Sequence, residues 1–328
     1  MRQAGSVAVV IPAYEAGATL AAALASVAAQ SVAPAEVVIG DDGSTDDTIA
    51  VARSWEDRLP IRVARTSRNL GPAGARHAAI EISTSPLLAL LDADDVWFPD
   101  HLSSMLAAFA TTDDGLASAD VLRWIPGEAI GAEPLSAGSV LPSPDRQLAW
   151  LLAANRLSVA GLFSRSRYDQ VGGFRTRFVG TEDWDLWIRM VRAGAVVVRP
   201  GHPTMLYRLR VGSVSSAERM VEARLAVLAA ATAEAGPLAT EEERQAIALG
   251  IRTTRAEGCL YTSYALATSG RLFAARIAGL RALRGIGPVA FRGAAMAIAP
   301  GHVSRRRERV RDDPDVWLRR YGPGGSAK

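Results

Sequence analysis

The first 120 or so residues alternate short β-branched apolar runs with longer stretches whose apolar residues repeat at helical spacing. Strand patterns lie at residues 7–11, 37–39, 61–64 and 86–91, and helical patterns lie at about 20–27, 46–55 and 73–82. Strands that are apolar on both faces and alternate with helices are typical of a parallel sheet covered on two sides. We therefore expect an α/β fold with a Rossmann-like, mostly parallel sheet, whose ligands bind beyond the carboxyl ends of the strands.

The pattern changes three times after this region. Residues 123–145 are rich in Pro, Gly and Ser and predict a long surface loop, and a second structured block runs from Leu148 to about Ser216. Residues 217–300 are helical in pattern, and the last 25 or so are charged. We therefore expect a domain at 1–216, with halves at about 1–121 and 146–216, followed by an α-helical extension with a basic tail at 217–328.

Composition limits the class of protein. A hydrophobic share of 49% and a charged share of 22% are ordinary for a globular chain and argue against disorder. The single cysteine, Cys259, excludes an internal disulfide and a cysteine-based metal site, which is consistent with a reducing cytoplasm. The apolar run at 7–11 is too short for a signal peptide, and no run reaches the ~18 apolar residues of a membrane span. These features predict a soluble, cytoplasmic protein.

Three carboxylates follow the fourth predicted strand within four residues: Asp92, Asp94 and Asp95. Like charges held this close raise one another's pKa unless a cation lies between them. Carboxylate oxygens are the preferred ligands of Mg²⁺ and Mn²⁺, which commonly bridge protein carboxylates to substrate phosphates. The alternative is a solvated acidic turn before the helix that starts near Pro99. We expect a divalent metal site here.

Other polar clusters are ambiguous when each is taken alone. Residues 11–15 could simply end the first strand, with a proline stopping the ladder and Tyr14 half-buried. Asp41 and Asp42 end the second strand, where they could form a turn or accept a hydrogen bond from a nucleobase. Glu182 and Asp183 begin a helix, where they could complement its dipole or supply a general base.

Together these clusters resemble the family-2 inverting glycosyltransferases of the GT-A fold, of bacterial type, over residues 6 to about 216. The resemblance rests on Ile-Pro-Ala-Tyr at 11–14, Asp-Asp-Gly-Ser-Thr-Asp at 41–46, Asn-Leu-Gly at 69–71 with Arg76, Leu-Asp-Ala-Asp-Asp at 91–95, Val-Gly-Gly-Phe at 171–174 and Glu-Asp-Trp-Asp-Leu-Trp at 182–187.

The resemblance implies roles for particular residues. Those expected to bind the nucleotide sugar are Pro12, Ala13, Tyr14 and Glu15 around the base, Asp42 on the base, Asp94 near the ribose, and Arg76 and Glu182. Asp95 is expected on the metal, with Asp94 and Asp92 in the same motif. Asp183 is the implied catalytic base. The sequence departs from the family at Arg210, where His is common, and at His77, where Asn is usual.

The implied activity is a single displacement with inversion at the sugar carbon. Asp183 would take the proton of an acceptor hydroxyl, while Mg²⁺ or Mn²⁺ neutralises charge on the departing nucleoside diphosphate. UDP is the default nucleotide, with dTDP or GDP possible. The acceptor is expected to be a glycan or lipid-linked glycan of cell-surface polysaccharide synthesis.

Two further alternatives are weighed on the residues. A nucleotidyltransferase would carry a Gly-rich phosphate loop after the first strand, and residues 11–17 contain none. A non-catalytic nucleotide-sugar-binding protein of the same fold is disfavoured by intact acids at 42, 94, 95 and 183.

The C-terminal third is basic. Arg271, Arg276, Arg281 and Arg284 accompany apolar residues spaced for one helical face, and further arginines lie at 305–311. Such a helix could lie on an anionic membrane, as a peripheral protein on the inner face, or pack on the catalytic domain with its arginines solvated. Nucleic acid is not an expected partner, because the tail lacks interleaved aromatic residues.

Overall fold

The computed structural model describes residues 7–124, 130, 134, 140–209, 217–268 and 277, without the side chains of 217, 218 and 260–268. The described residues form two compact units. The first contains the described residues up to Gln147 and those from Arg156 to Leu209, and the second contains Leu148–Asn155 and the described residues from Ala217 onward.

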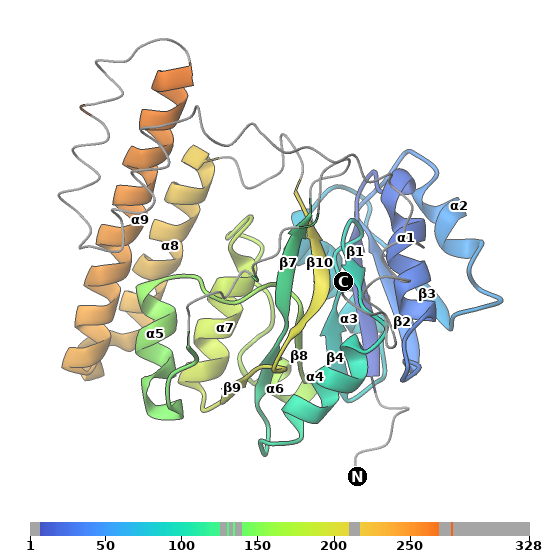
Figure 1. The fold of residues 1–328 in the computed structure, drawn as a ribbon, viewed down its shortest axis with the longest axis horizontal. Coiled ribbons are helices and arrows are strands. Elements are labelled where there is room, and N and C mark those ends of the chain that lie inside the picture. Colours follow the sequence, from blue (N-terminus) through green and yellow to red (C-terminus); the bar gives the residue numbers. More distant parts are fainter. Residues whose placement is uncertain are drawn as a thin grey trace. The chain divides into compact units, whose positions relative to one another are not determined.

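The elements of the first unit follow the predicted alternation (Figure 1). Its strands are β1 Val7–Ala13, β2 Glu36–Asp41, β3 Ile61–Arg65, β4 Leu87–Leu90, β5 Val96–Trp97, β6 Leu116–Ser118, β7 Asp120–Trp124, β8 Gly161–Ser164, β9 Val197–Val198 and β10 Pro203–Arg208. Its helices are α1 Gly17–Ala28, α2 Thr48–Arg53, α3 Gly71–Ile82, α4 His101–Phe109, η1 Pro144–Arg146, α6 Arg165–Gln170 and α7 Glu182–Arg192.

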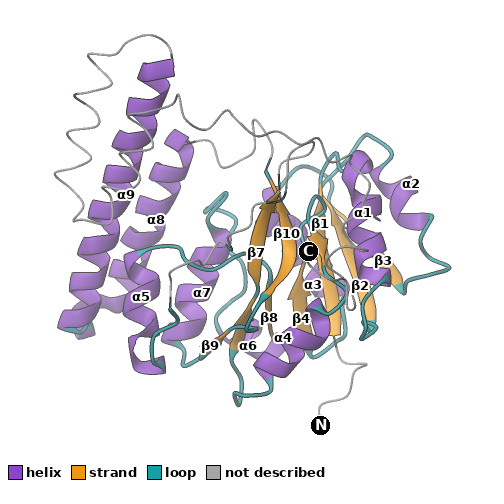
Figure 2. Cartoon of the chain, in the orientation of Figure 1, coloured by secondary structure: helices purple, strands orange, loops and turns teal. Residues whose placement is uncertain are grey.

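Among the described residues, seven strands form one sheet in the order β3-β2-β1-β4-β8-β6-β9. The pairs within β3-β2-β1-β4 and the pair β6/β9 are parallel, whereas β8 runs antiparallel to both of its neighbours. The chain steps outward from β1 to β3 and then returns to β4, so right-handed crossovers place α1 and α2 on one face and α3 on the other. Figure 2 shows these strands with helices around them. The predicted mostly parallel α/β sheet is confirmed.

Alternation along β1 divides the core between the two faces. Val7, Val9 and Ile11 pack with Leu20 and Leu24 of α1 in one buried cluster. The intervening residues of β1 are equally buried and face the side covered by α3, which packs on β1, β2 and β3. Burial on both faces explains why these strands read as unbroken apolar runs.

Gly40 shows how closely α3 lies on the sheet. A Cβ atom on Gly40 would stand 2.0 Å from the carbonyl oxygen of Ala75 in α3. Only a residue without a side chain allows this approach. The contact fixes the part of α3 that carries the next residue, Arg76.

A second sheet joins β10, near the end of the first unit, to β5 and β7. Among the described residues it has three strands in the order β5-β10-β7. β10 is antiparallel to β5, with Leu206 opposite Val96, and parallel to β7, with Arg208 opposite Trp124. The last residues of β10 are therefore brought next to the loop that precedes β5.

Three local expectations are corrected. β1 continues through Pro12 to Ala13. The odd-numbered residues of β1 form its hydrogen bonds to β2, so the missing N–H of Pro12 does not interrupt that pairing. Pro12 faces β4 instead, and the pairing of β1 with β4 ends at Val10. Residues 123 and 124 belong to β7 rather than to the predicted loop. β3 is only partly buried, because it lies at the sheet edge.

The second unit is helical, as expected. It contains most of α5 Gln147–Ala153, together with α8 Ala217–Ala235, η2 Gly236–Leu238 and α9 Glu241–Thr268. Arg224 of α8 forms an ion pair with Glu257 of α9, and Leu228 lies against Gly250, so the two helices run antiparallel. No helix in the described part of the chain is long and apolar enough to cross a membrane. The arginines predicted to contact a membrane, at 271–284 and 305–311, lie outside the described residues, as does Arg210.

Candidate active site

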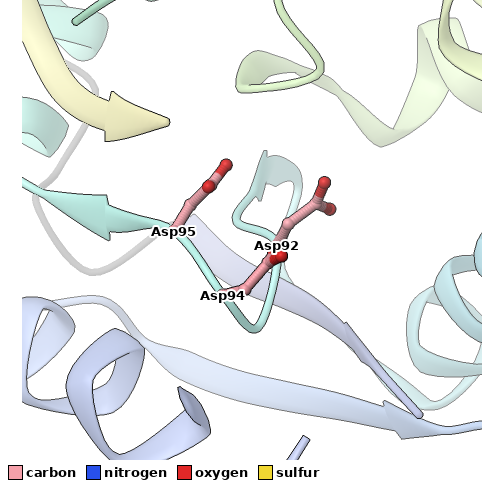
Figure 3. Close-up of side chains that lie close together, drawn as sticks. All are labelled: Asp92, Asp94 and Asp95. Atoms are coloured by element: carbon pink, nitrogen blue, oxygen red, sulfur yellow. The ribbon is translucent and has the colours of Figure 1, made fainter. Parts of the chain in front are cut away.

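The three carboxylates that follow the fourth predicted strand lie on the short loop between β4 and β5 (Figure 3). Asp92, Asp94 and Asp95 each offer a carboxylate oxygen, and these atoms lie within 4.8 Å of one another. The loop begins where the pairing of β1 with β4 ends, because Pro12 has no N–H to extend the hydrogen bonds between these strands. It is closed by a hydrogen bond from the amide of Asp95 to the carbonyl of Asp92 at 3.0 Å. The structure therefore brings the three carboxylates together, and their role as metal ligands stays a prediction.

Asp95 is the buried member of this cluster. Its Oδ1 accepts the backbone N–H of Arg208 at 2.9 Å, while its Oδ2 is buried and has no hydrogen-bond partner among the described residues. Burial raises the pKa of Asp95 well above its usual range, and the charges of Asp92 and Asp94 raise it further. A carboxylate placed in this way is stabilised as an anion only by a cation near its free oxygen.

The donor set fits a hard divalent cation. The three carboxylates supply the oxygen ligands that Mg²⁺ and Mn²⁺ prefer, and one of them, Asp95, has a buried oxygen without a hydrogen-bond partner among the described residues. Three protein ligands also leave room for the water or phosphate ligands that such ions retain. Asp92 and Asp94 are partly exposed, which leaves the cluster accessible to a phosphate group.

A buried arginine joins this cluster to α7. Arg76 donates from Nη2 to Asp92 Oδ1 at 2.6 Å and from Nη1 to Glu182 Oε1 at 2.6 Å. Burial disfavours the charge of Arg76, but the Asp92 and Glu182 carboxylates outweigh it and raise the pKa of Arg76. Arg76 and Glu182, both expected to contact the nucleotide sugar, are thus bonded to each other.

Asp183 is the next residue of α7 and is partly buried. Its Oδ1 accepts the N–H of Trp184 at 2.7 Å, which orients the carboxylate. Burial and then the neighbouring charge of Glu182 raise the pKa of Asp183, against the opposing charge of Arg76, to about 7. A general base works best when its pKa is near the working pH, so this carboxylate is suited to accept a proton.

The helix that carries Asp183 is firmly anchored. Trp184 and Trp187 are fully buried, as their helical spacing predicts. Arg189 pairs with Asp185 at 2.7 Å and donates to the carbonyls of Val171 at 2.6 Å and Gly173 at 2.7 Å. The Val-Gly-Gly-Phe motif therefore holds α7 in place through one buried guanidinium.

Asp42 organises the turn at the neighbouring strand end. Its carboxylate accepts the backbone N–H groups of Leu70 at 2.8 Å and Gly71 at 2.7 Å, and the hydroxyl of Thr66 at 2.9 Å. Two motifs that are far apart in the sequence, Asp-Asp-Gly-Ser at 41–44 and Asn-Leu-Gly at 69–71, thus form one structure. The carboxylate is 2% exposed, so any bond to a nucleobase adds to contacts that it already makes.

Residues 12–15 lie at the mouth of this turn. The side chain of Glu15 accepts hydrogen bonds from the amide of Thr45 at 2.8 Å and its hydroxyl at 2.9 Å. Glu15 adopts a left-handed backbone with φ of 48°. Tyr14 is 53% exposed, so it is about half-buried, as expected. It follows Ala13, whose carbonyl accepts the N–H of Asp42 at 2.8 Å. A partly exposed aromatic ring provides a flat apolar surface on which a base can stack.

Two site residues were given no role from the sequence. Burial raises the pKa of Tyr207, and the charges of Asp95, Asp92, Asp94 and Asp183 raise it further. Tyr207 follows Leu206 of β10, which pairs with Val96 directly after Asp95. Arg208 donates from Nε to the carbonyl of Asp94 at 2.8 Å and lies over the Trp124 ring, 4.3 Å from its centroid. The position of these two residues beside the acidic loop depends on the pairing of β10 with β5, which no local sequence pattern shows.

Comparison with known proteins identifies this arrangement. Residues 8–140 match the family model described as glycosyl transferase family 2. These residues form a family-2 glycosyltransferase domain. The match includes the acidic loop and Asp42, and it ends before α7, so Asp183 lies outside the part that the family-2 model covers.

Curated relatives resemble the same domain. The chain is 49% identical over 102 residues to the succinoglycan biosynthesis protein ExoU of Rhizobium meliloti, which is 31% of this chain and 30% of that protein. It is 44% identical over 105 residues to a validoxylamine A glucosyltransferase of Streptomyces hygroscopicus, 31% of this chain and 23% of that protein. The matched stretch thus spans less than a third of either relative.

A more distant relative is matched over a longer stretch. It is named UDP-Glc:alpha-D-GlcNAc-diphosphoundecaprenol beta-1,3-glucosyltransferase WfgD, from Escherichia coli, and it is 24% identical over 211 residues. This match covers 64% of the chain and 79% of that protein.

Solved structures share the fold at low identity. S. aureus TarS 1–349 in complex with UDP gives a TM-score of 0.59 at 14% identity, over 92% of this chain and 93% of that one. The mannosyltransferase PcManGT from Pyrobaculum calidifontis, in complex with GDP-Man and Mn²⁺, gives 0.56 at 18% identity, over 89% and 84%. The likeness shows the fold, which is the predicted GT-A fold with C-terminal helices.

Proposed function

We propose that this protein is an inverting, metal-dependent glycosyltransferase that moves a sugar from a nucleoside diphosphate to an acceptor hydroxyl. The observation that carries the proposal is the buried Oδ2 of Asp95, which has no hydrogen-bond partner among the described residues and belongs to the Asp92–Asp94–Asp95 cluster. Arg76 links this cluster to Glu182, the residue before Asp183. A cation site and a base of suitable pKa are the two parts that this reaction needs.

The residues of the chain divide the work. Asp183 accepts the proton of the acceptor hydroxyl as that oxygen attacks the anomeric carbon, and the bond from that carbon to the diphosphate breaks. Asp92, Asp94 and Asp95 would hold a Mg²⁺ or Mn²⁺ ion, which when bound supplies neutralising charge for the leaving diphosphate. The raised pKa of Tyr207 keeps its hydroxyl protonated, so it remains a hydrogen-bond donor beside the acidic loop.

The domain limits proposed for this chemistry are residues 1–216, with a helical extension beyond. The donor side is formed by residues of the first half: Pro12, Ala13, Tyr14, Glu15, Asp42 and Asp94. The base comes from the second half, near Asp183, on the side proposed for the acceptor.

We take UDP as the default donor nucleotide. WfgD is named for UDP-Glc, and solved TarS structures hold UDP and UDP-GlcNAc, whereas PcManGT holds GDP-Man. For the acceptor, the names of ExoU and WfgD point to exopolysaccharide or diphospholipid-linked glycan synthesis. We therefore propose a glycan or lipid-linked acceptor at the cytoplasmic face of a membrane.

The activity is tested by incubating the chain with Mn²⁺ and UDP-α-glucose, UDP-GlcNAc or GDP-mannose, and measuring nucleoside diphosphate release. Slow hydrolysis of an accepted donor reports the stereochemistry without an acceptor, because proton NMR resolves the two anomers of the freed sugar. Inversion gives the β-anomer first from an α-linked donor. The α-anomer first would contradict inversion, and no turnover of any donor, together with tight nucleotide binding, would favour the non-catalytic alternative.

The membrane association is proposed from the sequence of the basic segment alone. Sedimentation with vesicles of anionic lipid should recover the full chain in the pellet, and removal of residues 271–328 should return it to the supernatant. Recovery of the full chain in the supernatant would contradict this part of the proposal.

A further inference from the structure

Arg76 makes a largely buried ionic bridge between Asp92 and Glu182. The side chains of Arg76 and Glu182 are only 3% and 6% exposed, whereas Asp92 is 26% exposed. Both bonds of the bridge measure 2.6 Å. The Arg76 guanidinium is packed 5.6 Å from the centroid of the Phe174 ring. Burial of this degree leaves little of either side chain for contact with a substrate.

One end of the bridge sets the start of α7. Glu182 accepts Arg76 on Oε1, and its other oxygen, Oε2, accepts the backbone N–H of Gly180 at 2.7 Å. Gly180 has φ of 81°, in the left-handed region, so this bond closes the turn that leads into the helix. Asp183 is the next residue, and the same turn therefore fixes its carboxylate.

The other end of the bridge reaches the acidic loop. Nη2 of Arg76 binds Asp92, one of the three carboxylates that converge there. A guanidinium this close draws on the negative charge that Asp92 offers to a cation. Arg76 itself is held by α3, whose preceding residue packs on Gly40 of the sheet.

We propose that Arg76 and Glu182 are a positioning pair: a buried bridge that couples cation binding at the acidic loop to the placement of Asp183. The proposal rests on the proposed function for the role of Asp183, and it replaces direct donor contact as the role of the two residues. The negative charge of Glu182 partly neutralises Arg76 and so weakens the attraction between Arg76 and Asp92. Through Arg76, Glu182 acts on a metal site that it does not touch.

The bridge predicts a pattern that independent charges do not. Arg76→Gln frees Asp92 and should tighten Mn²⁺ binding on the order of tenfold, as expected for removal of a cation a few ångströms away. Glu182→Gln leaves Arg76 wholly on Asp92 and should weaken Mn²⁺ binding several-fold. In the double variant, the effect of Glu182→Gln should vanish, because its route through Arg76 is gone.

The experiment is isothermal titration of Mn²⁺ alone into the full chain, the two single variants and the double variant. Arg189→Gln is the matched control. It also removes a buried guanidinium, but one that lies in α7 and pairs with Asp185 at 2.7 Å. This variant should lower the melting temperature without changing Mn²⁺ affinity. Circular dichroism checks that each variant is folded. If Arg76→Gln does not fold, Arg76→Met takes its place, because it also removes the positive charge beside Asp92.

The result expected is a double variant that binds Mn²⁺ like the Arg76 variant. Additive shifts, or weaker Mn²⁺ binding by Arg76→Gln, would overturn the coupling. Where the protein turns over a donor, Arg76→Lys should lower kcat at nearly unchanged donor KM, and a rise in KM with kcat unchanged would restore direct donor contact. A wild-type chain that turns over no donor contradicts the proposed function, while the Mn²⁺ cycle still decides whether the bridge exists.

Discussion

Asp95 Oδ1 accepts the backbone N–H of Arg208 at 2.9 Å, across a separation of 113 residues. This bond ties the acidic loop to the last described strand of the first unit. It also satisfies one oxygen of a buried carboxylate with a neutral donor, while the other oxygen has no hydrogen-bond partner in the described part of the chain. The two carboxylate oxygens of Asp95 therefore differ in role: Oδ1 fixes the loop, and Oδ2 is available to the proposed cation.

The catalytic role of Asp183 is tested by Asp183→Asn. The amide can still accept the Trp184 N–H, so the helix start should be unchanged, but it cannot accept a proton. Transfer should fall by about 10²–10⁴-fold, the usual contribution of a general base, while nucleotide binding persists. Asp57→Asn, in an exposed turn, is the control. Turnover equal to wild type would remove Asp183 from the mechanism.

The raised pKa of Asp183 predicts a pH profile. Because the base must be ionised, kcat should rise with pH and reach half its maximum near the pKa of about 7. Below that value the slope should approach tenfold per pH unit. Steady-state rates at saturating donor between about pH 5 and pH 9 give the profile. A rate that stays flat below neutral pH would contradict a base of this pKa.

The same shift predicts an effect on stability. The pKa of Asp183 is about 7 in the folded chain and 3.8 without its surroundings, so the folded state holds the proton more tightly. Wild-type stability should therefore decline as pH rises between these values, and the cost should be complete above pH 7. Melting temperatures should show Asp183→Asn more stable than wild type at alkaline pH, with the difference shrinking toward pH 4. The opposite trend would contradict the assigned burial of the charge.

The close packing of α3 on the sheet predicts a steric effect. Gly40→Ala would place its Cβ 2.0 Å from the Ala75 carbonyl oxygen, which belongs to the backbone and cannot rotate away. We expect a loss of about 1–3 kcal/mol in the free energy of unfolding, as for other overpacked sites. Gly201→Ala, where nothing lies within 4 Å, should be neutral. Urea denaturation measures both, and equal stability of the two variants would refute the contact.

Local sequence patterns predicted much of the fold. The strands from β1 to β4 and helices α1, α3 and α7 follow from apolar periodicity, because their burial is set by a repeating pattern within one segment. The acidic cluster was found for a similar reason, since its three carboxylates lie within four residues. The partial exposure of β3 could not be predicted, because its place at the sheet edge depends on strand order.

Site features that join distant segments were beyond reach. Arg76 and Glu182 are 106 positions apart, and their resemblance to a motif suggested contact with the donor rather than with each other. The commitment of Asp42 to the amides of Leu70 and Gly71 was likewise hidden. Each depends on which strand ends meet, and that is fixed by topology and not by any local run of residues.

Asp95 is the residue on which the proposed metal-dependent nucleotide site depends. Its role is tested by isothermal titration of UDP, dTDP and GDP into wild type and Asp95→Asn, each with and without Mn²⁺. We expect one nucleotide to bind wild type tightly only with Mn²⁺, and the variant to lose that dependence, because the amide cannot neutralise the cation. Nucleotide binding that is the same with and without Mn²⁺, or no binding of any nucleotide to folded wild type, would contradict the claim.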